Sequence, residues 1–140
     1  MTILRFGIIY GPRPNNWSAV ENLFNSARTK SEIQVGSATT SRRFIHVDDI
    51  VGGILAARGR KGFEIFNLSG DRQVSLGEVI EASARMLNRE VRVVETNQSQ
   101  RSVRNPDNAK AREQLGWRPA IDLQAGLATL QRFFEQSGGR

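Results

Sequence analysis

Hydrophobic positions along the chain alternate between strand-like runs and helix-like spacings. Residues 2–10 form a nearly continuous apolar run, which suits a strand buried on both faces in a parallel sheet. Apolar side chains then recur at helical spacing from Trp17 to about Lys30. Phe63–Leu68 is a second apolar strand. This alternation of β and α elements predicts an α/β fold.

Shorter segments fill the intervals between these elements. The short strands are expected to form a separate small sheet and fall at residues 33–35, 43–47 and 91–94. About five helices are predicted, over residues 17–30, 50–57, 75–87, 105–115 and from 122 onward. The two apolar strands are expected to lie in a parallel sheet that carries helices on its faces.

Polar residues at the predicted helix starts can cap free backbone groups. Ser75 and Glu78 form the pattern S-x-x-E, in which each side chain bonds a backbone N–H of the first turn. Asp48 and Asp122 also precede predicted helices. Their carboxylates can accept hydrogen bonds from N–H groups of the first turn, so both are predicted to be helix caps.

Composition limits the kind of protein that this sequence can encode. The 140 residues fit a single domain over positions 1–140, and a frayed tail is expected at 137–140. No apolar run approaches the roughly 20 residues needed to cross a bilayer, so we expect a cytoplasmic protein. The chain has no cysteine and one histidine, His46. Disulfides and thiolate metal sites are therefore excluded, and we expect no metal site.

The formal net charge is +6, and arginine supplies most of it. Arginine suits small phosphorylated ligands, because its guanidinium can bond two phosphate oxygens at once. Basic chains also bind nucleic acid through its phosphates. The arginines here are scattered and no nucleic-acid motif is present, so we favour a small phosphate ligand over nucleic acid. A solvated basic surface is the remaining explanation.

Four sequence blocks resemble the motifs of one enzyme family. Leu4–Arg13 (LRFGIIYGPR) is similar to the LRxxNxYGPR block of extended short-chain dehydrogenases/reductases, and Arg42–Ile50 (RRFIHVDDI) resembles their RDFxxVDDV block. Phe66–Glu78 resembles FNxGSG…SLxE, and Asp107–Leu127 matches DxxKAxxxLGWxPxxxLxxGL. Because all four occur in the family's order, the chain is identified as the C-terminal, substrate-binding portion of a nucleotide-sugar epimerase/dehydratase.

The resemblance implies a Rossmann-type extended fold, a UDP- or dTDP-linked sugar as ligand, and NAD or NADP as the cofactor of the complete enzyme. The family's glycine-rich GxxGxxG loop and YxxxK catalytic pair do not occur in this sequence: its one tyrosine is Tyr10, and Pro14 stands four residues later. We therefore expect no catalytic residue, no cofactor bound by this chain alone and no turnover by it. Whether the parent is an epimerase, dehydratase or reductase stays open.

The resemblance also implies contacts to the nucleotide-sugar. Arg42 matches an arginine that contacts the diphosphate. Asn16 and Trp17 match a stretch that touches the nucleotide-sugar, at the expected start of a helix whose N-terminus favours an anion. Gln34 and Val35 match a short strand that lies against the uracil.

Two further regions complete the expected site. Arg101, or Arg104 in its place, lies in the loop where epimerases carry an arginine that binds ribose and phosphate. Tyr10, Gly11 and Pro12 match residues near the nicotinamide end of the site.

Plainer structural roles are open for several of these residues. Arg42 can be a surface arginine or a partner of Asp48, and Asn16 can be a helix cap. Asp48 and Asp49 fit a cap with a solvated or salt-bridged neighbour. His46, on an apolar strand, is more often a packed histidine than a catalyst.

Two positions depart from the family pattern. Ile8 stands where the family has a substrate asparagine, and Arg43 replaces the usual aspartate. The alternative function is a stand-alone, non-catalytic nucleotide-sugar-binding or scaffold protein derived from the family. Because an isolated strand at 3–10 would expose edges and apolar faces, we expect a homo-oligomer.

Overall fold

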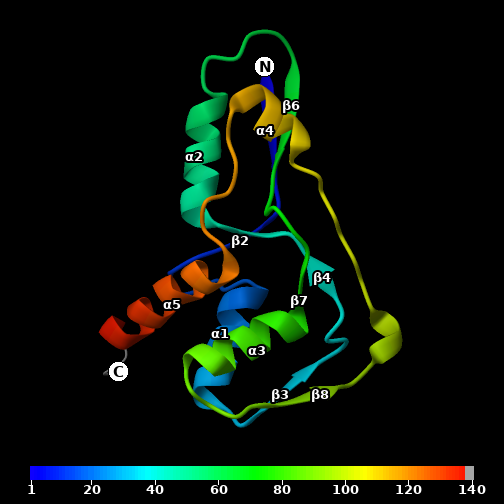
Figure 1. Cartoon of the computed structure of the whole chain (residues 1–140), viewed down its shortest axis with the longest axis vertical. Helices are drawn as coiled ribbons and strands as arrows, with labels where there is room; N and C mark the ends of the chain where they lie inside the picture. The colour runs from blue at the N-terminus through cyan, green and yellow to red at the C-terminus, as the bar shows by residue number, and fades with distance from the viewer. Residues whose placement is uncertain (138–140) are drawn as a thin grey trace.

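The structure, a computed structural model, describes residues 1–137 and contains five α-helices and eight short strands in that range (Figure 1). The helices are α1 (Ala19–Thr29), α2 (Val47–Ala57), α3 (Leu76–Met86), α4 (Ala109–Leu115) and α5 (Leu123–Ser137). The strands are β1 (Thr2–Phe6), β2 (Ile8–Tyr10), β3 (Glu32–Val35), β4 (Ser41–Arg42), β5 (Phe44–His46), β6 (Glu64–Leu68), β7 (Val74–Ser75) and β8 (Arg92–Glu95). A 3-10 turn, η1, spans Gln98–Gln100. The tail predicted at 137–140 lies outside the described residues, apart from Ser137, which ends α5.

The strands associate in pairs. β1 pairs with β6, β2 with β5 and β3 with β8, all in parallel, whereas β4 and β7 are antiparallel. The predicted α/β class with parallel strands is therefore confirmed. The short strands form separate pairs instead of one small sheet.

The apolar run at residues 2–10 is not one strand, because the chain breaks at Gly7. A Cβ on Gly7 would lie 2.6 Å from the carbonyl oxygen of Arg43, so only glycine fits this close approach. The prediction of burial on both faces is wrong, since Ile3 is 36% exposed. Successive strand side chains point to opposite faces, and Leu4 is the neighbour that packs into the core.

Two hydrophobic clusters hold the elements together. The first lies among α2, α4 and β6, in the upper half of Figure 1, and contains Ile45, Ile50, Phe66, Leu68, Ala111 and Trp117. The second lies among α1, α3 and α5, and its largest buried side chains include Phe24, Ile80, Leu127 and Leu130. The third and fifth helices each bury one apolar stripe, Val79 and Ile80 on α3 and Leu127, Leu130 and Phe134 on α5, and Trp117 is buried as well. None of the helices within residues 1–137 combines the length and the hydropathy needed to cross a bilayer.

The start of α2 differs from the prediction. His46 is the N-cap, and its Nδ1 accepts a hydrogen bond from the backbone N–H of Asp48 at 3.2 Å. The side chain of Asp48 is 72% exposed, so Asp48 is not the cap. Asp49 is buried and accepts hydrogen bonds from the backbone N–H groups of Ala120 and Ile121, both at 2.9 Å. The expected cap with a solvated neighbour is therefore wrong.

Asp49 ties α2 to the segment that enters α5. Trp117 Nε1 adds a third bond, because it donates to the backbone carbonyl of Asp49 at 3.0 Å. These three hydrogen bonds join the first hydrophobic cluster to the chain segment that leads into the second cluster. The partners lie about 70 positions away in the sequence, so no local pattern around Asp49 could indicate them.

His46 is a packed histidine, as expected. Its Nε2 lies 2.9 Å from Thr129 Oγ1, which itself donates to the carbonyl of Gly126 at 2.6 Å. Nδ1 accepts a hydrogen bond from the backbone N–H of Asp48, and Nε2 donates one to Thr129 Oγ1. The ring therefore carries a single proton, on Nε2. Burial lowers the pKa of His46, although the nearby carboxylate of Asp48 acts in the opposite direction. The Tyr10 ring packs edge-on against it, with centroids 5.4 Å apart.

Replacing Asp49 with alanine should lower the free energy of unfolding by about 2–4 kcal/mol, because two backbone N–H groups would lose a charged acceptor. Asp48→Ala, the matched change at the exposed neighbour, should cost less than about 1 kcal/mol. Urea denaturation followed by circular dichroism measures both values. Equal losses in the two variants would contradict the role given to Asp49.

Stability should fall as pH drops below about 6.5, the pKa of an unfolded histidine. The folded state has the lower His46 pKa, so the unfolded state binds the proton first and is favoured in acid. His46→Asn keeps a capping acceptor without a titrating ring. Between pH 7.5 and 5.5 the unfolding free energy of this variant should change less than that of the wild type, and identical pH profiles would refute the assignment.

Candidate functional site

A cavity of about 130 Å³ lies beside the break between β1 and β2 and is lined by three arginines. We call it the arginine cavity, and its lining residues are Phe6, Gly7, Ile8, Arg42, Arg43, Arg104 and Pro106. None of these residues is acidic, so the cavity has a positive potential. Guanidinium groups bind phosphate or carboxylate through paired charge-assisted hydrogen bonds, and the cavity is therefore suited to an anion.

Arg42 ends β4, and its guanidinium faces the loop that follows β8. Nη1 donates to the carbonyl oxygens of Ser41 at 2.8 Å and Ser102 at 2.9 Å, and Nη2 donates to Ser102 Oγ at 3.2 Å. The pairing with Asp48 that the sequence left open is not among its contacts. Arg42 is half-buried and is one of the residues that line the cavity.

The loop that carries Arg101 and Arg104 connects β8 to α4, and its last part lies along β4. Ser41 donates its backbone N–H to the carbonyl of Ser102 at 2.9 Å and accepts from the N–H of Arg104 at 3.2 Å. A parallel bridge joins Ser41 to Val103. Arg104 is placed in the cavity lining by these bonds, whereas Arg101 is exposed at the end of η1 and does not line it.

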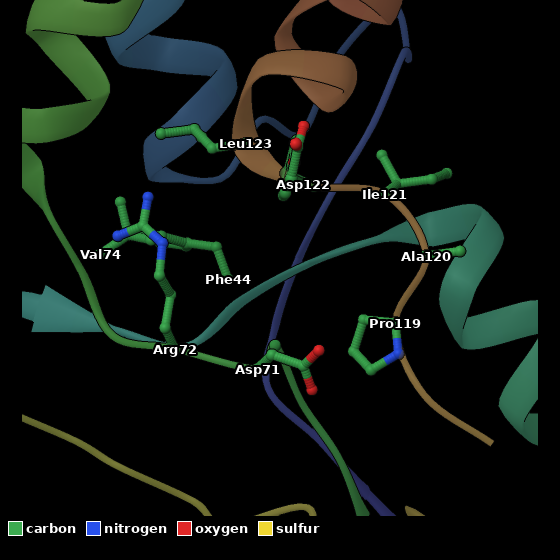
Figure 2. A pocket seen from close by; sticks show the side chains of 11 residues that line it. Phe44, Asp71, Arg72, Val74, Pro119, Ala120, Ile121, Asp122 and Leu123 are labelled. Carbon is green, nitrogen blue, oxygen red and sulfur yellow. The ribbon is translucent and has the colours of Figure 1, made fainter. Parts of the chain in front are cut away.

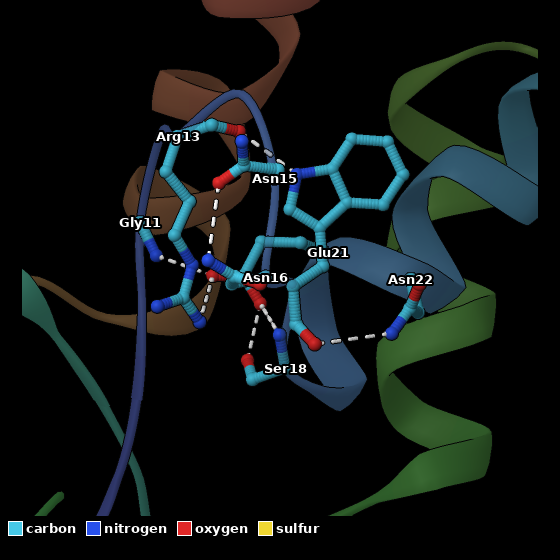
Figure 3. Close-up of polar contacts among 8 residues, drawn as sticks. Gly11, Arg13, Asn15, Asn16, Ser18, Glu21 and Asn22 are labelled. Atoms are coloured by element: carbon cyan, nitrogen blue, oxygen red, sulfur yellow. Dashed lines mark hydrogen bonds and ion pairs between the residues drawn. The ribbon is translucent and has the colours of Figure 1, made fainter.

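Asn16 and Trp17 precede α1 and do not open it. The helix begins at Ala19 with Ser18 as N-cap, so both the predicted start and the capping role of Asn16 are wrong. Asn16 is exposed, has a φ of 57°, and donates its side-chain amide to Asn15 Oδ1 at 3.2 Å (Figure 3). Trp17 is half-buried and donates from Nε1 to the carbonyl of Arg13 at 2.8 Å.

Glu21 occupies the N-terminus of α1 and was not singled out from the sequence. It is buried and accepts hydrogen bonds from the backbone N–H groups of Gly11 at 3.1 Å and Ser18 at 2.9 Å (Figure 3). Arg13 lies 3.2 Å away and balances its charge. Ser18–Glu21 repeats the S-x-x-E pattern found at Ser75, and this signal could have revealed it.

The carboxylate of Glu21 occupies the position at the start of α1 where a bound anion was expected. A helix N-terminus attracts phosphate through its free N–H groups and its dipole. At α1 a protein carboxylate already takes this place, so the expected anion site at this helix start is not supported. The same carboxylate takes up the backbone N–H groups of Gly11 and Ser18, so this turn does not offer them to a dinucleotide pyrophosphate.

Gln34 and Val35 lie on β3, away from the arginine cavity. Gln34 is exposed, whereas Val35 is buried in the second cluster. The carbonyl of Val35 accepts the backbone N–H of Thr96 at 2.8 Å. Neither residue lines the arginine cavity, so the structure does not bring them together with Arg42.

Tyr10, Gly11 and Pro12 form the end of β2 and the turn after it. Tyr10 and Gly11 are buried and Pro12 is exposed. Burial raises the pKa of the Tyr10 hydroxyl, and the charges of Asp49 and Asp122 add to this effect. A Cβ on residue 126 would overlap that hydroxyl, which explains the glycine there.

A second cavity, of about 200 Å³, is lined by Tyr10 and by the segment that enters α5 (Figure 2). Its lining includes two carboxylates, those of Asp71 and Asp122, which disfavour an anion. Asp71 pairs with Arg118 at 3.2 Å, and Arg72 pairs with Glu78 at 3.1 Å. The arginine cavity is therefore the better candidate for an anionic ligand. In residues 1–137 no group of three potential metal ligands converges.

Comparison with known proteins agrees with these observations. The model of the NAD dependent epimerase/dehydratase family matches residues 1–69. The UDP-glucuronate 4-epimerase of Thermodesulfobacterium geofontis is 27% identical over 131 residues, which cover 91% of this chain and 41% of that protein. UDP-glucuronic acid decarboxylase 3 of Arabidopsis thaliana is 28% identical over 137 residues, which cover 94% and 40%. The chain thus spans about two fifths of the length of these relatives.

Solved structures share the fold over the same portion. The UDP-glucose 4-epimerase of Thermotoga maritima, solved with UDP-glucose, has a TM-score of 0.82 and 24% identity, covering 97% of this chain and 46% of that one. The UDP-glucuronic acid 4-epimerase of Bacillus cereus, solved with UDP-glucuronic acid and NAD, has a TM-score of 0.83 and 23% identity, covering 97% and 45%. These structures show that the chain shares their fold, and residues 1–69 are similar in sequence to the NAD dependent epimerase/dehydratase family.

Proposed function

We propose that this chain binds the diphosphate of a UDP- or dTDP-linked sugar in the arginine cavity, as the substrate-binding part of an NAD(P)-dependent epimerase/dehydratase. The observation that carries the proposal is the convergence of Arg42, Arg43 and Arg104 on one cavity with no acidic lining residue. Relatives of known structure were solved with UDP-glucose or UDP-glucuronic acid, which supports the ligand class.

The size of the cavity defines which part of the ligand it holds. Sites for whole drug-sized ligands usually measure about 300–1,000 Å³. A volume of about 130 Å³ accommodates the diphosphate, while the base and the sugar extend beyond it. Ile8 has no hydrogen-bonding group, so the apolar side of the cavity gives the sugar no polar contact from this position.

The remaining predicted contacts belong to the outer parts of the ligand. Asn16 presents an exposed amide and Gln34 an exposed side chain, and both can hydrogen-bond to a base or a sugar. Trp17 supplies half-buried apolar surface and Arg101 an exposed charge, whereas Val35, whose side chain is buried, can contribute only its backbone. Placing all of them around one ligand requires that it extend from the arginine cavity towards β3 and the start of α1.

The chain has no Tyr–Lys pair and no glycine-rich loop, so oxidation of the sugar and binding of the dinucleotide require residues other than these. Pro12 is exposed at the end of the β2 turn and can contact the nicotinamide side of the complete site. By itself the chain is proposed to bind ligand without turning it over.

UDP should bind the wild-type chain, and uridine, which lacks the diphosphate, should bind at least about tenfold more weakly, because charge-assisted hydrogen bonds are lost. Affinity for UDP should fall with added salt, since the guanidinium charges are screened. NAD should give no heat of binding. Isothermal titration calorimetry measures all three ligands, and tight NAD binding or equal affinity for UDP and uridine would contradict the proposal.

We further propose that copies of the chain self-associate through exposed apolar side chains. Ile3 is exposed on β1, and Val51, Ile54 and Leu55 are exposed on α2 at spacings that share one side of the helix. Exposed apolar patches of this kind favour association. Light scattering should give a mass above the monomer at high concentration, and the double variant Val51→Lys, Leu55→Lys should reduce it. A wild-type monomer at every concentration would exclude this proposal.

A further inference from the structure

The cavity beside Tyr10 is separate from the arginine cavity, and we call it the tyrosine cavity. The two share no lining residue. Among the described residues that line it, only Asp71, Arg72 and Asp122 are charged, and most of the others are apolar (Figure 2). Its volume of about 200 Å³ lies below the roughly 300–1,000 Å³ of sites for drug-sized ligands, so it suits a small molecule with an apolar part.

The hydroxyl of Tyr10 is a buried polar group at the border of this cavity. Its oxygen lies against Gly126 in the first turn of α5. Ile121 and Asp122, just before this turn, line the cavity, so the hydroxyl is the end of Tyr10 that borders it. Tyr10 is only 2% exposed, yet its hydroxyl forms no hydrogen bond to any residue in the range 1–137. A buried hydroxyl without a protein partner is uncommon and points to a polar group of a ligand.

Two of the three charged residues of the tyrosine cavity are paired. Asp71 forms an ion pair with Arg118 at 3.2 Å, and Arg72 forms one with Glu78 at 3.1 Å. The charges within each pair cancel. Asp122 is therefore the one lining residue whose charge no ion pair within residues 1–137 balances.

Asp122 has one carboxylate oxygen free for a ligand. Oδ1 caps α5 by accepting the backbone N–H of Ala125 at 2.8 Å, whereas Oδ2 accepts no hydrogen bond from the described part of the chain. The N-terminus of a helix carries about half a positive elementary charge, which is less than the full negative charge of the carboxylate. The potential at this end of the cavity is therefore negative.

The pKa of the Tyr10 hydroxyl agrees with a negative potential. Burial raises this pKa most, and the charges of Asp49 and Asp122 raise it further. The phenol is therefore neutral at physiological pH and can both donate and accept a hydrogen bond. An anion is disfavoured beside it. An ammonium group has three N–H donors and can bond the Asp122 carboxylate and the phenol oxygen together.

We propose that the tyrosine cavity binds a small organic cation, in which a primary ammonium group is carried on a short apolar chain. The ammonium group bonds Asp122 and Tyr10, and the apolar chain packs against Phe44, Val74 and Ile121. The charge-assisted hydrogen bonds orient the ligand, and the apolar chain adds buried area. This site is distinct from the proposed UDP site and does not depend on it.

A change at Tyr10 tests the unpaired hydroxyl without any ligand. Tyr10→Phe removes only the hydroxyl, so its urea midpoint should equal or exceed that of the wild type, because no hydrogen bond is lost. Thr129→Val is the matched change at a hydroxyl with two partners, His46 Nε2 and the carbonyl of Gly126, and it should lower the midpoint. A fall in Tyr10→Phe as large as that in Thr129→Val would overturn the ligand role of the phenol.

The class of ligand is tested with three probes of similar size, n-butylammonium, n-butanol and butyrate. Each is titrated into the ¹⁵N-labelled chain while the amide NMR signals of Leu123 and Gly126 are followed. n-Butylammonium should shift both signals to saturation, with a Kd at least about fivefold lower than that of n-butanol, because only the cation bonds the carboxylate by charge-assisted hydrogen bonds. Butyrate should give no saturable shift.

Variants assign the binding to named side chains. Asp122→Asn keeps a capping oxygen and removes the charge, so its Kd for n-butylammonium should rise at least about fivefold while its Kd for n-butanol stays unchanged. Tyr10→Phe should raise the Kd for n-butylammonium at least about threefold, because one hydrogen bond to the ligand is lost. Asp48→Asn, at a carboxylate that is 72% exposed on α2, is the control and should bind as the wild type does.

Three results would each overturn the proposal. The first is the absence of a saturable shift with n-butylammonium, or a shift matched by n-butanol at equal Kd. The second is binding of butyrate as strong as that of n-butylammonium, since this would mark the cavity as an anion site. The third is an unchanged Kd for n-butylammonium in Asp122→Asn.

Discussion

The buried carboxylate of Asp49 accepts hydrogen bonds from two consecutive backbone N–H groups, at Ala120 and Ile121, and the rest of the structure depends on this contact. It joins α2, which packs in the first hydrophobic cluster, to the chain that enters α5, which packs in the second. Between these clusters lie β2 and β5; β4 ends at Arg42, and Arg43 connects it to β5. The position of the arginine cavity therefore follows from how the two clusters are held together.

Close approaches of the backbone define the rest of the site. Gly7 lets the chain pass against the carbonyl of Arg43, which breaks the first strand and opens space beside Ile8. The loop after β8 closes the other side of this space through its bonds to Ser41 and Arg42. A phosphate-sized, positively charged cavity results, built from segments that are distant in the sequence and meet at β4.

Local patterns in the sequence predicted the fold well where the interactions are local. Three such features depend on local spacing: the capping box at Ser75 and Glu78, the cap at Asp122 and the parallel apolar strands. The buried role of Asp49 and the His46 cap could not be predicted in this way. Asp49 bonds residues 71 and 72 positions away, and a carboxylate beside another carboxylate reads as a solvated pair.

The candidate site likewise contains some residues that local sequence patterns indicate and others that only distant contacts reveal. Arg42 could be singled out because its block resembles the family motif, but its partner Ser102 lies in a loop without a pattern. Glu21 could have been found from S-x-x-E at Ser18, and recognising it would have removed the anion site expected at the start of α1. Arg104 and Arg101 are equivalent in the sequence, and only the pairing of their loop with β4 distinguishes them.

The most direct test of the account is a crystal structure of the chain soaked with UDP. We expect electron density for the diphosphate inside the arginine cavity, within hydrogen-bonding distance of the guanidinium groups that line it. Density for the diphosphate at the cavity beside Tyr10, at the start of α1 or at another surface, with the arginine cavity empty, would contradict it.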